Sequence, residues 1–200
     1  MVKAVIFDCG NVLHRVENKH IKKDIGLTLA VNIEMVEKLW RKLVPSFGRG
    51  EITEKEFWQK FLRQSGSKKP LPKESLFVRE LRKRYKAYDD VMKIVYQLKE
   101  KGIRLAVLSN TIAPHVKFLT SKSLFRLFDI KIFSNEVGFQ KPDKRMYRLA
   151  LNKLGVQPAE TVLIDDEPTH IKAGMKAGVR GILFQSIKQL KRDLIKLGVL

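Results

Sequence analysis

Five short apolar runs, each ending in polar or charged residues, predict buried β-strands. The segments between the later runs have the length and apolar spacing of helices. The runs span 3–8, 104–108, 131–133, 161–164 and 180–184, and the helical segments include 146–154 and 168–177. Such alternation of strand and helix predicts an α/β fold, in which helices cover both faces of a parallel sheet.

The segment between the first two predicted strands interrupts this alternation, because roughly ninety residues are far more than one connection needs. Its amphipathic pieces, 33–43 and 57–62, predict helices. Thr53 followed by Glu56 is the pattern of a capping box, in which each side chain accepts a hydrogen bond from the other residue's backbone N–H. The segment is therefore interpreted as a helical insertion.

These signals divide the chain into two units. We expect a small helical cap at 14–88 and a core formed by 1–13 and 89–200. The core is expected to resume with a helix over 89–101 that ends at Gly102, since glycine commonly follows the last helical turn.

The composition is that of an ordinary globular protein, with 44% apolar residues in a chain of 200. No apolar run approaches the ~20 residues that cross a bilayer. The apolar start reaches Asp8 too soon for the core of a signal peptide, so we expect a cytoplasmic protein with no membrane contact. Cys9 is the only cysteine, which excludes a disulfide framework and a cysteine-based zinc site within one chain.

The charge balance is strongly positive, because 40 Lys and Arg residues outnumber 21 Asp and Glu residues and give a net charge of +19. Such a field attracts polyanions, phosphorylated metabolites and acidic surfaces alike. Nucleic-acid binding is not favoured, since the excess is spread along the chain and no nucleic-acid-binding module accompanies it. Lysine-rich, solvated helix surfaces are the simpler interpretation.

Polar residues gather at the predicted strand ends, which is where open parallel sheets bind their ligands. Each residue has an ordinary structural explanation when taken alone. Together they supply carboxylates, a hydroxyl, an amide and a cation: Asp8, Ser109, Asn110, Lys141, Asp165 and Asp166. Converging carboxylates raise one another's pKa unless a cation neutralises them, and an oxygen-rich site suits Mg²⁺. The lysine and the hydroxyl add affinity for a tetrahedral dianion such as phosphate.

Four motifs in fixed order carry a family resemblance: Phe7-Asp8-Cys9-Gly10-Asn11-Val12-Leu13, Leu108-Ser109-Asn110, Lys141-Pro142-Asp143 and Leu163-Ile164-Asp165-Asp166. In this order and spacing they resemble the motifs of the haloacid dehalogenase (HAD) superfamily over essentially the whole chain. The Asp-x-Gly-Asn-Val form of the first motif is similar to that of a sugar-phosphate-phosphatase-like subgroup. The resemblance implies a Rossmann-like core and a magnesium-dependent phosphatase that works through an aspartyl-phosphate.

The resemblance also implies a role for each site residue. Asp8 would be the nucleophile that attacks phosphorus. Mg²⁺ would be held by the carboxylates of Asp8 and Asp166 and by the main-chain carbonyl of Gly10, with Asp165 acting directly or through water. The phosphoryl oxygens would be bound, and their charge in the transition state offset, by Ser109, Asn110 and Lys141.

The first motif departs from the family pattern at one position. Relatives carry a second aspartate that serves as general acid and base, where this chain has Gly10. Because such assistance is worth about 10²–10⁴-fold in rate, we expect slow turnover. His14 is a candidate substitute that titrates near neutral pH, and the alternative is that His14 and His170 have no catalytic part.

The favoured function is therefore hydrolysis of a small phosphorylated metabolite, a sugar phosphate or a nucleotide, with the cap selecting the substrate. Metal-free dehalogenation of a haloacid is a weaker alternative, since paired carboxylates at Asp165 and Asp166 disfavour a site that must release halide. The alternative from another class is a catalytically weak binding or regulatory module, whose basic surface holds nucleic acid or an acidic partner. No oligomeric state is predicted.

Overall fold

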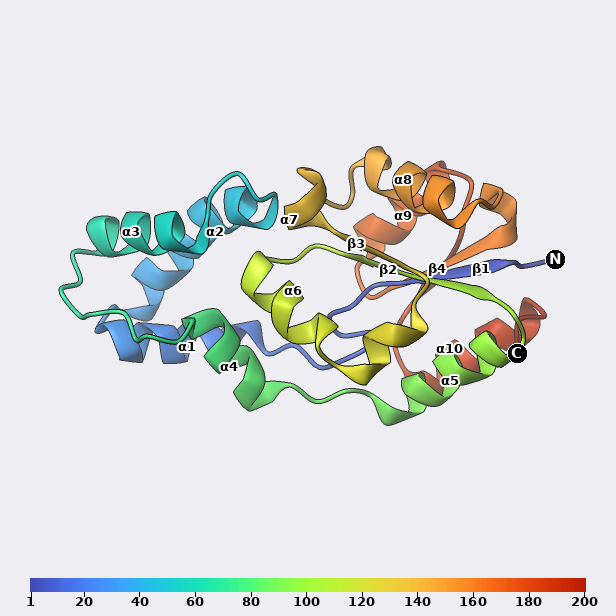
Figure 1. Ribbon diagram of the computed structural model, residues 1–200, viewed down its shortest axis with the longest axis horizontal. Coiled ribbons are helices and arrows are strands. Elements are labelled where there is room, and N and C mark those ends of the chain that lie inside the picture. Colours follow the sequence, from blue (N-terminus) through green and yellow to red (C-terminus); the bar gives the residue numbers. More distant parts are fainter.

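Five parallel strands form one sheet in the computed structural model, which describes residues 1–200. The strands are β1 (Ala4–Phe7), β2 (Arg104–Ser109), β3 (Ile130–Phe133), β4 (Thr161–Asp165) and β5 (Arg180–Leu183). Their order across the sheet is β3-β2-β1-β4-β5, so the first strand lies at the centre (Figure 1). The five predicted strands, the parallel sheet and the α/β class are confirmed.

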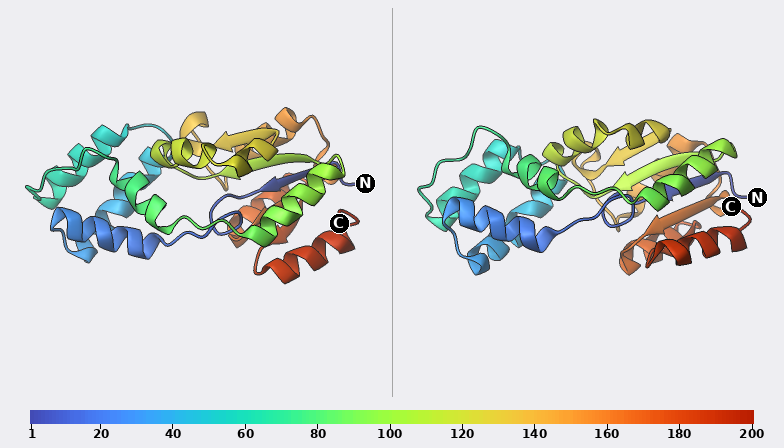
Figure 2. Two further views of the ribbon diagram at one scale, coloured as in Figure 1. Left: turned by 60° about the horizontal axis from the view of Figure 1, so that its bottom comes forward. Right: turned by 90° about the horizontal axis from the view of Figure 1, so that it is seen from below.

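Helices cover both faces of this sheet (Figures 1 and 2). One face packs against α5 (Asp89–Glu100), α6 (Ala113–Thr120) and α10 (Ile187–Lys196), and the other against α8 (Lys144–Leu154) and α9 (Pro168–Lys176). The two faces are separated by side-chain alternation along the strands. Val5 and Phe7 of β1 therefore enter one apolar core, while Ala4 and Ile6 enter the other.

Four helices occupy the long segment between β1 and β2. They are α1 (Asn18–Leu29), α2 (Ile33–Gly48), α3 (Glu54–Ser65) and α4 (Leu76–Arg84). Their buried face is a separate aromatic cluster that includes Phe47, Phe57 and Phe77. In Figure 1 they lie beyond one end of the sheet rather than on its faces. The predicted boundaries of a cap at 14–88 stay a prediction.

The local signals for helix ends agree with the structure. The Thr53 hydroxyl accepts a hydrogen bond from the Glu56 backbone N–H, and the Glu56 carboxylate accepts one from the Thr53 N–H. Gly102 follows α5 with a φ of 74°, a left-handed conformation that glycine adopts without strain. The helix predicted at 33–43 extends further at its C-terminal end, as α2, and the helix predicted at 57–62 extends at both ends, as α3.

Shorter elements complete the connections: a four-residue helix α7 (Ser134–Val137) and two 3₁₀ turns, η1 (Ser123–Leu127) and η2 (Pro158–Glu160). A span of the bilayer needs a helix that is both long and apolar, and none of the helices meets that requirement.

Candidate active site

The central position of β1 brings polar side chains from three strands to one edge of the sheet. The strand register pairs Phe7 with Val107 of β2 and with Ile164 of β4. Asp8, which directly follows β1, therefore lies level with Asp165 at the end of β4. Ligand sites of open parallel sheets form at this carboxyl edge, as the sequence predicts here.

Lys141 connects the two carboxylates. Its ammonium donates a hydrogen bond to Asp8 Oδ1 at 2.7 Å and another to Asp165 Oδ2 at 2.6 Å. The lysine is 1% exposed and Asp165 is fully buried, so both charges depend on this pairing. The four-carbon stem comes from the loop between α7 and α8, which reaches across the strand ends.

The electrostatics of this group are those of a buried, mutually paired cluster. Burial raises the pKa of the Asp8 carboxyl to about 6, with Lys141 opposing the rise and Asp165 adding to it. Burial also acts to lower the pKa of Lys141, but the two carboxylates outweigh it and the net shift is upward. The lysine is therefore held as a cation beside Asp8 at neutral pH.

Two further contacts orient Asp165. Its Oδ1 accepts a hydrogen bond from the Glu167 backbone N–H at 2.9 Å, and His170 Nδ1 lies 3.0 Å from the same oxygen. Burial acts to raise the pKa of Asp165, yet the hydrogen bond from His170 and the charge of Lys141 keep it below its ordinary value. Both carboxylate oxygens of Asp165 are thus already engaged, which favours a positioning role for this residue.

Three carboxylates converge closely enough to hold a metal ion. Asp8, Asp165 and Asp166 each offer one oxygen, and these oxygens lie within 4.8 Å of one another. An all-oxygen, anionic donor set fits a hard divalent cation. Asp166 is oriented by Asn11, whose side-chain amide donates to Asp166 Oδ2 at 3.0 Å.

Asn11 itself occupies a special backbone position that the sequence reading did not assign to the site. Its φ of 57° lies in the left-handed region, which asparagine tolerates better than most residues. Its side-chain oxygen accepts a hydrogen bond from the Val16 N–H at 3.1 Å, which closes the loop after β1. The only sequence signal was its place in the Asp-x-Gly-Asn motif.

Asn110 also has a role that its position alone did not reveal. Its side-chain amide donates to the Lys141 carbonyl at 2.9 Å, and its side-chain oxygen accepts from the Lys141 N–H at 2.8 Å. This reciprocal pair fixes the backbone from which the buried ammonium reaches Asp8. Ser109, the last residue of β2, is buried beside it.

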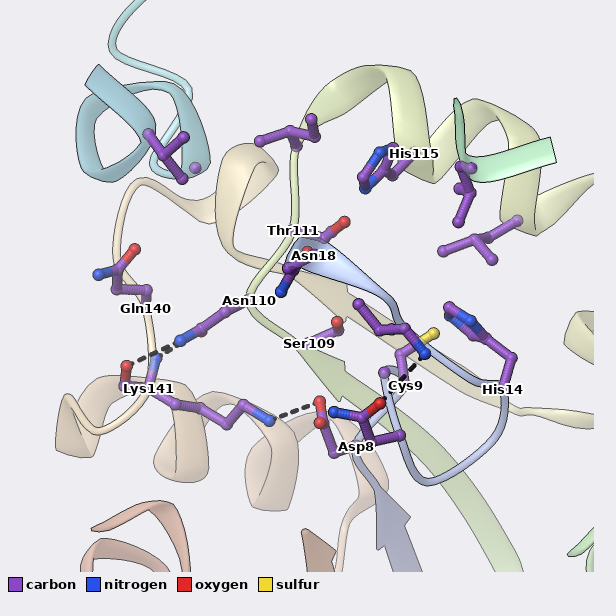
Figure 3. Close-up of a pocket in the computed structure, with 18 of the residues that line it drawn as sticks. Asp8, Cys9, His14, Asn18, Ser109, Asn110, Thr111, His115, Gln140 and Lys141 are labelled. Carbon is purple, nitrogen blue, oxygen red and sulfur yellow. Dashed lines mark hydrogen bonds and ion pairs between the residues drawn. The ribbon is translucent and has the colours of Figure 1, made fainter. Parts of the chain in front are cut away.

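These residues open onto a cavity of about 310 Å³ that extends toward the helices between β1 and β2 (Figure 3). Of the predicted site residues, Asp165 is fully buried and does not line the cavity, while the others do: Asp8, Gly10, Ser109, Asn110, Lys141 and Asp166. The four motifs therefore meet at one place, although the roles assigned to their residues stay predictions.

Gly10 lies where a side chain would collide with a neighbour. A Cβ at this position would be 2.9 Å from Cγ2 of Val16, closer than van der Waals contact allows. The φ of Gly10 is not positive, so the restriction is one of space and not of backbone conformation. Val16 fills the room that the family's second aspartate would need.

Cys9 precedes Gly10 and His14 pairs with it through a β-bridge, and the two residues differ in their chemistry. His14 lines the cavity and is buried, and burial lowers the pKa of its imidazole. His14 Nδ1 lies 3.0 Å from the Arg15 carbonyl, so Nδ1 carries the proton in the neutral ring and Nε2 does not. Cys9 is buried and burial raises the pKa of its thiol, which agrees with a small apolar residue and not a nucleophile.

Comparison with known proteins then identifies the family. The family model of the haloacid dehalogenase-like hydrolases matches residues 2–178. The chain belongs to this family. The predicted membership of the HAD superfamily and the Rossmann-like α/β fold are confirmed, whereas the subgroup suggested by the first motif stays a prediction.

Individual relatives and solved structures place the chain within the family. A glyceraldehyde 3-phosphate phosphatase of Methanothermobacter thermautotrophicus is 26% identical over 98% of this chain and 92% of its own. A phosphoserine phosphatase of Thermus thermophilus is 33% identical, but the match covers 53% of this chain and 43% of that protein. A HAD family enzyme of Bacteroides thetaiotaomicron, solved with magnesium and inorganic phosphate, has a TM-score of 0.78 at 18% identity, covering 92% of this chain and 95% of its own. The last similarity concerns the fold alone.

Proposed function

We propose that this hydrolase is a magnesium-dependent phosphatase that cleaves a small phosphorylated metabolite, a sugar phosphate or a nucleotide, through an aspartyl-phosphate on Asp8. The observation that carries the proposal is the charge of the cluster at the strand ends. Three carboxylates and the single ammonium of Lys141 leave an excess of two negative charges at one point. A divalent cation offsets that excess, and the site can then accept a phosphate dianion.

The metal ligands in this proposal are the carboxylates of Asp8 and Asp166 and the main-chain carbonyl of Gly10. When bound, Mg²⁺ would supply the positive charge that draws electron density from the phosphoryl oxygens and screens the nucleophile from its dianionic substrate. The name of the phosphatase from Methanothermobacter and the magnesium-phosphate complex of the Bacteroides enzyme support magnesium-dependent phosphatase chemistry, and the choice of ligands is our proposal. Asp165 holds Lys141 and keeps its charge near the reacting group.

The first step forms a bond between an Asp8 carboxylate oxygen and phosphorus while the bond from phosphorus to the ester oxygen breaks. The electron pair leaves with the alcohol oxygen, which takes a proton from water. Lys141, Ser109 and the Asn110 backbone N–H would hold the phosphoryl oxygens, so the geometry of these donors supplies most of the catalysis. In the second step a water oxygen attacks phosphorus, and the phosphate leaves the Asp8 carboxylate.

The proton released by that water needs an acceptor, and we place His14 in this role. Because Nδ1–H is directed to the Arg15 carbonyl, Nε2 is the nitrogen that can take a proton. Burial favours the neutral ring, which is the form that acts as a base. This role differs from the sequence-based hypothesis, in which His14 replaces the missing acid.

The test is a phosphate-release screen over metabolites with Mg²⁺ or EDTA, together with acid quenching to capture a labelled phosphoenzyme. We expect Mg²⁺-dependent release and an acid-stable, hydroxylamine-sensitive label in the wild type, and neither in Asp8→Asn. Asp90→Asn is the matched control, since Asp90 is an exposed carboxylate that is paired with Lys93 and does not line the cavity. Equal phosphate release by wild type and Asp8→Asn would refute the proposal.

A further inference from the structure

The cavity has a charged end and an uncharged end. Figure 3 shows Asp8 and Lys141 at one end and His115 at the other. The charged end holds all the carboxylates that line the cavity, Asp8 and Asp166, together with the only lining lysine or arginine, Lys141. This separation is unexpected in a chain with 40 lysines and arginines.

The rest of the cavity combines an apolar wall with the neutral polar residues Asn18, Thr111 and Gln140. The wall is contributed by α1, α2, α4, α6 and the residue before α6, through Ile21, Trp40, Val44, Leu81, Leu119 and Ile112. Trp40 is half-buried and rests against Phe77, with ring centroids 5.6 Å apart, so its indole forms a fixed, flat wall. Arg49, the cation that follows α2, is paired with Glu51 and does not line the cavity.

One polar group in this apolar region has no partner. His115 Nε2 is buried and makes no hydrogen bond within the protein. Burial is the main cause that lowers the pKa of His115 to about 4, so the ring is neutral at physiological pH. His115 lines the cavity, but its Nε2 has almost no accessible surface, so the neutral ring adds no charge to this end and offers this nitrogen to no ligand atom in the present arrangement.

We propose that the alcohol released from the phosphate ester is uncharged and has an apolar or aromatic body. This inference rests on the proposed phosphatase function and narrows its substrate class. An ester with a second phosphate, a carboxylate or an ammonium would leave that charge unpaired against an apolar wall, at a large desolvation cost. The modest volume favours a body of one or two rings.

The first experiment compares kcat/KM for esters that differ only in the alcohol. Phenyl phosphate and pyrimidine nucleoside 5′-monophosphates have uncharged leaving groups with an aromatic part, whereas phosphoserine, 3-phosphoglycerate and fructose 1,6-bisphosphate carry extra charge. We expect kcat/KM for the first set to exceed that for the second by at least tenfold, the factor of about one unsatisfied charged contact. Higher values for the charged esters would overturn the inference and leave the phosphatase function standing. No Mg²⁺-dependent release from any ester would instead refute the function.

Substitutions at the wall test the same point from the protein's side. Val44→Lys adds a cation to the uncharged end, and Val44→Met adds length without charge. We expect Val44→Lys to raise KM for phenyl phosphate and to lower KM for 3-phosphoglycerate about tenfold, while Val44→Met changes the order of the two substrates little. An unchanged preference in folded Val44→Lys would contradict the placement of the alcohol at this wall.

A fluorescence readout separates binding from turnover. In the Asp8→Asn background, phenyl phosphate should quench the fluorescence of Trp40 at concentrations at which phosphoserine does not, and Trp40→Phe should remove the signal. Equal quenching by phenyl phosphate and phosphoserine would contradict the placement of the alcohol against Trp40.

Discussion

Gly10→Asp restores the carboxyl group that the family pattern places two residues after the nucleophile, and the structure predicts why this change alone fails. The new Cβ would be 2.9 Å from Val16 Cγ2, so either the side chain or the loop must move. Forcing extra atoms into a filled space costs about 1–3 kcal/mol. We expect Gly10→Asp to unfold at lower urea concentration and to gain little activity, because its carboxylate is displaced.

Removing the obstacle should reveal the catalytic value of the added group. Val16→Ala deletes the two methyl groups and keeps the backbone N–H that bonds to Asn11 Oδ1. The double variant Gly10→Asp/Val16→Ala should therefore recover most of the lost stability. Its kcat should exceed that of Val16→Ala by at least tenfold, within the range of about 10²–10⁴-fold that general acid–base assistance supplies.

The matched control is Gly10→Asn/Val16→Ala, which has nearly the same volume without a titratable group. Steady-state kinetics with an activated and an unactivated ester separate the two explanations, since a poor leaving group gains most from a general acid. If the aspartate and asparagine double variants have equal kcat with the unactivated ester, the reasoning from space and proton transfer is wrong.

Four other predictions concern the same site. Asn11→Ala should raise the Mg²⁺ concentration needed for half-maximal activity by about 10–100-fold, because Asp166 loses its orienting amide. Asn11→Gly should show the same shift without backbone strain, because glycine tolerates the positive φ at this position. His14→Gln should abolish a limb of the kcat–pH profile below pH 6.5, and an unchanged profile would exclude His14 as the base. In metal-free protein, the folded state holds the Asp8 proton more tightly than the unfolded state, so the free energy of unfolding of the wild type should fall as pH rises from 3.8 to about 6. Above this window Asp8→Asn should be more stable than the wild type by at most about 3 kcal/mol. Urea unfolding in EDTA measures the difference. Added salt should lower kcat/KM for anionic esters and leave kcat unchanged, as expected if the net charge of +19 acts on association.

Much of the fold could be predicted because its signals are local. Apolar runs of strand length end in polar residues, and the Thr53–Glu56 pattern and Gly102 mark helix ends by their own backbone requirements. The alternation of elements then fixes the parallel class, and the carboxyl edge follows from that class. Six site residues could therefore be assigned to one edge of the sheet from the sequence: Asp8, Ser109, Asn110, Lys141, Asp165 and Asp166.

The features that escaped prediction depend on distances between residues whose separation the sequence does not express. The Asn110 side chain holds the Lys141 backbone across 31 positions, and Asn11 holds Asp166 across 155. Val16 reads as an ordinary apolar residue, yet its position over Gly10 decides whether an aspartate fits there. No pattern of residue types carries such information, because each case is a matter of ångströms between side chains.

The net charge of the protein acts on the approach of the substrate, and the cavity wall acts on its binding. A basic surface and a cavity wall without charge are therefore compatible. A field from 19 excess positive charges attracts any phosphorylated molecule and does not discriminate among them, since it acts at long range and is screened by salt. Discrimination needs contact, and at the wall formed by Trp40, Val44 and Ile112 contact removes water from the alcohol without offering it a charge. The net charge thus attracts phosphorylated molecules in general, and the cavity wall selects among them by the alcohol that they carry.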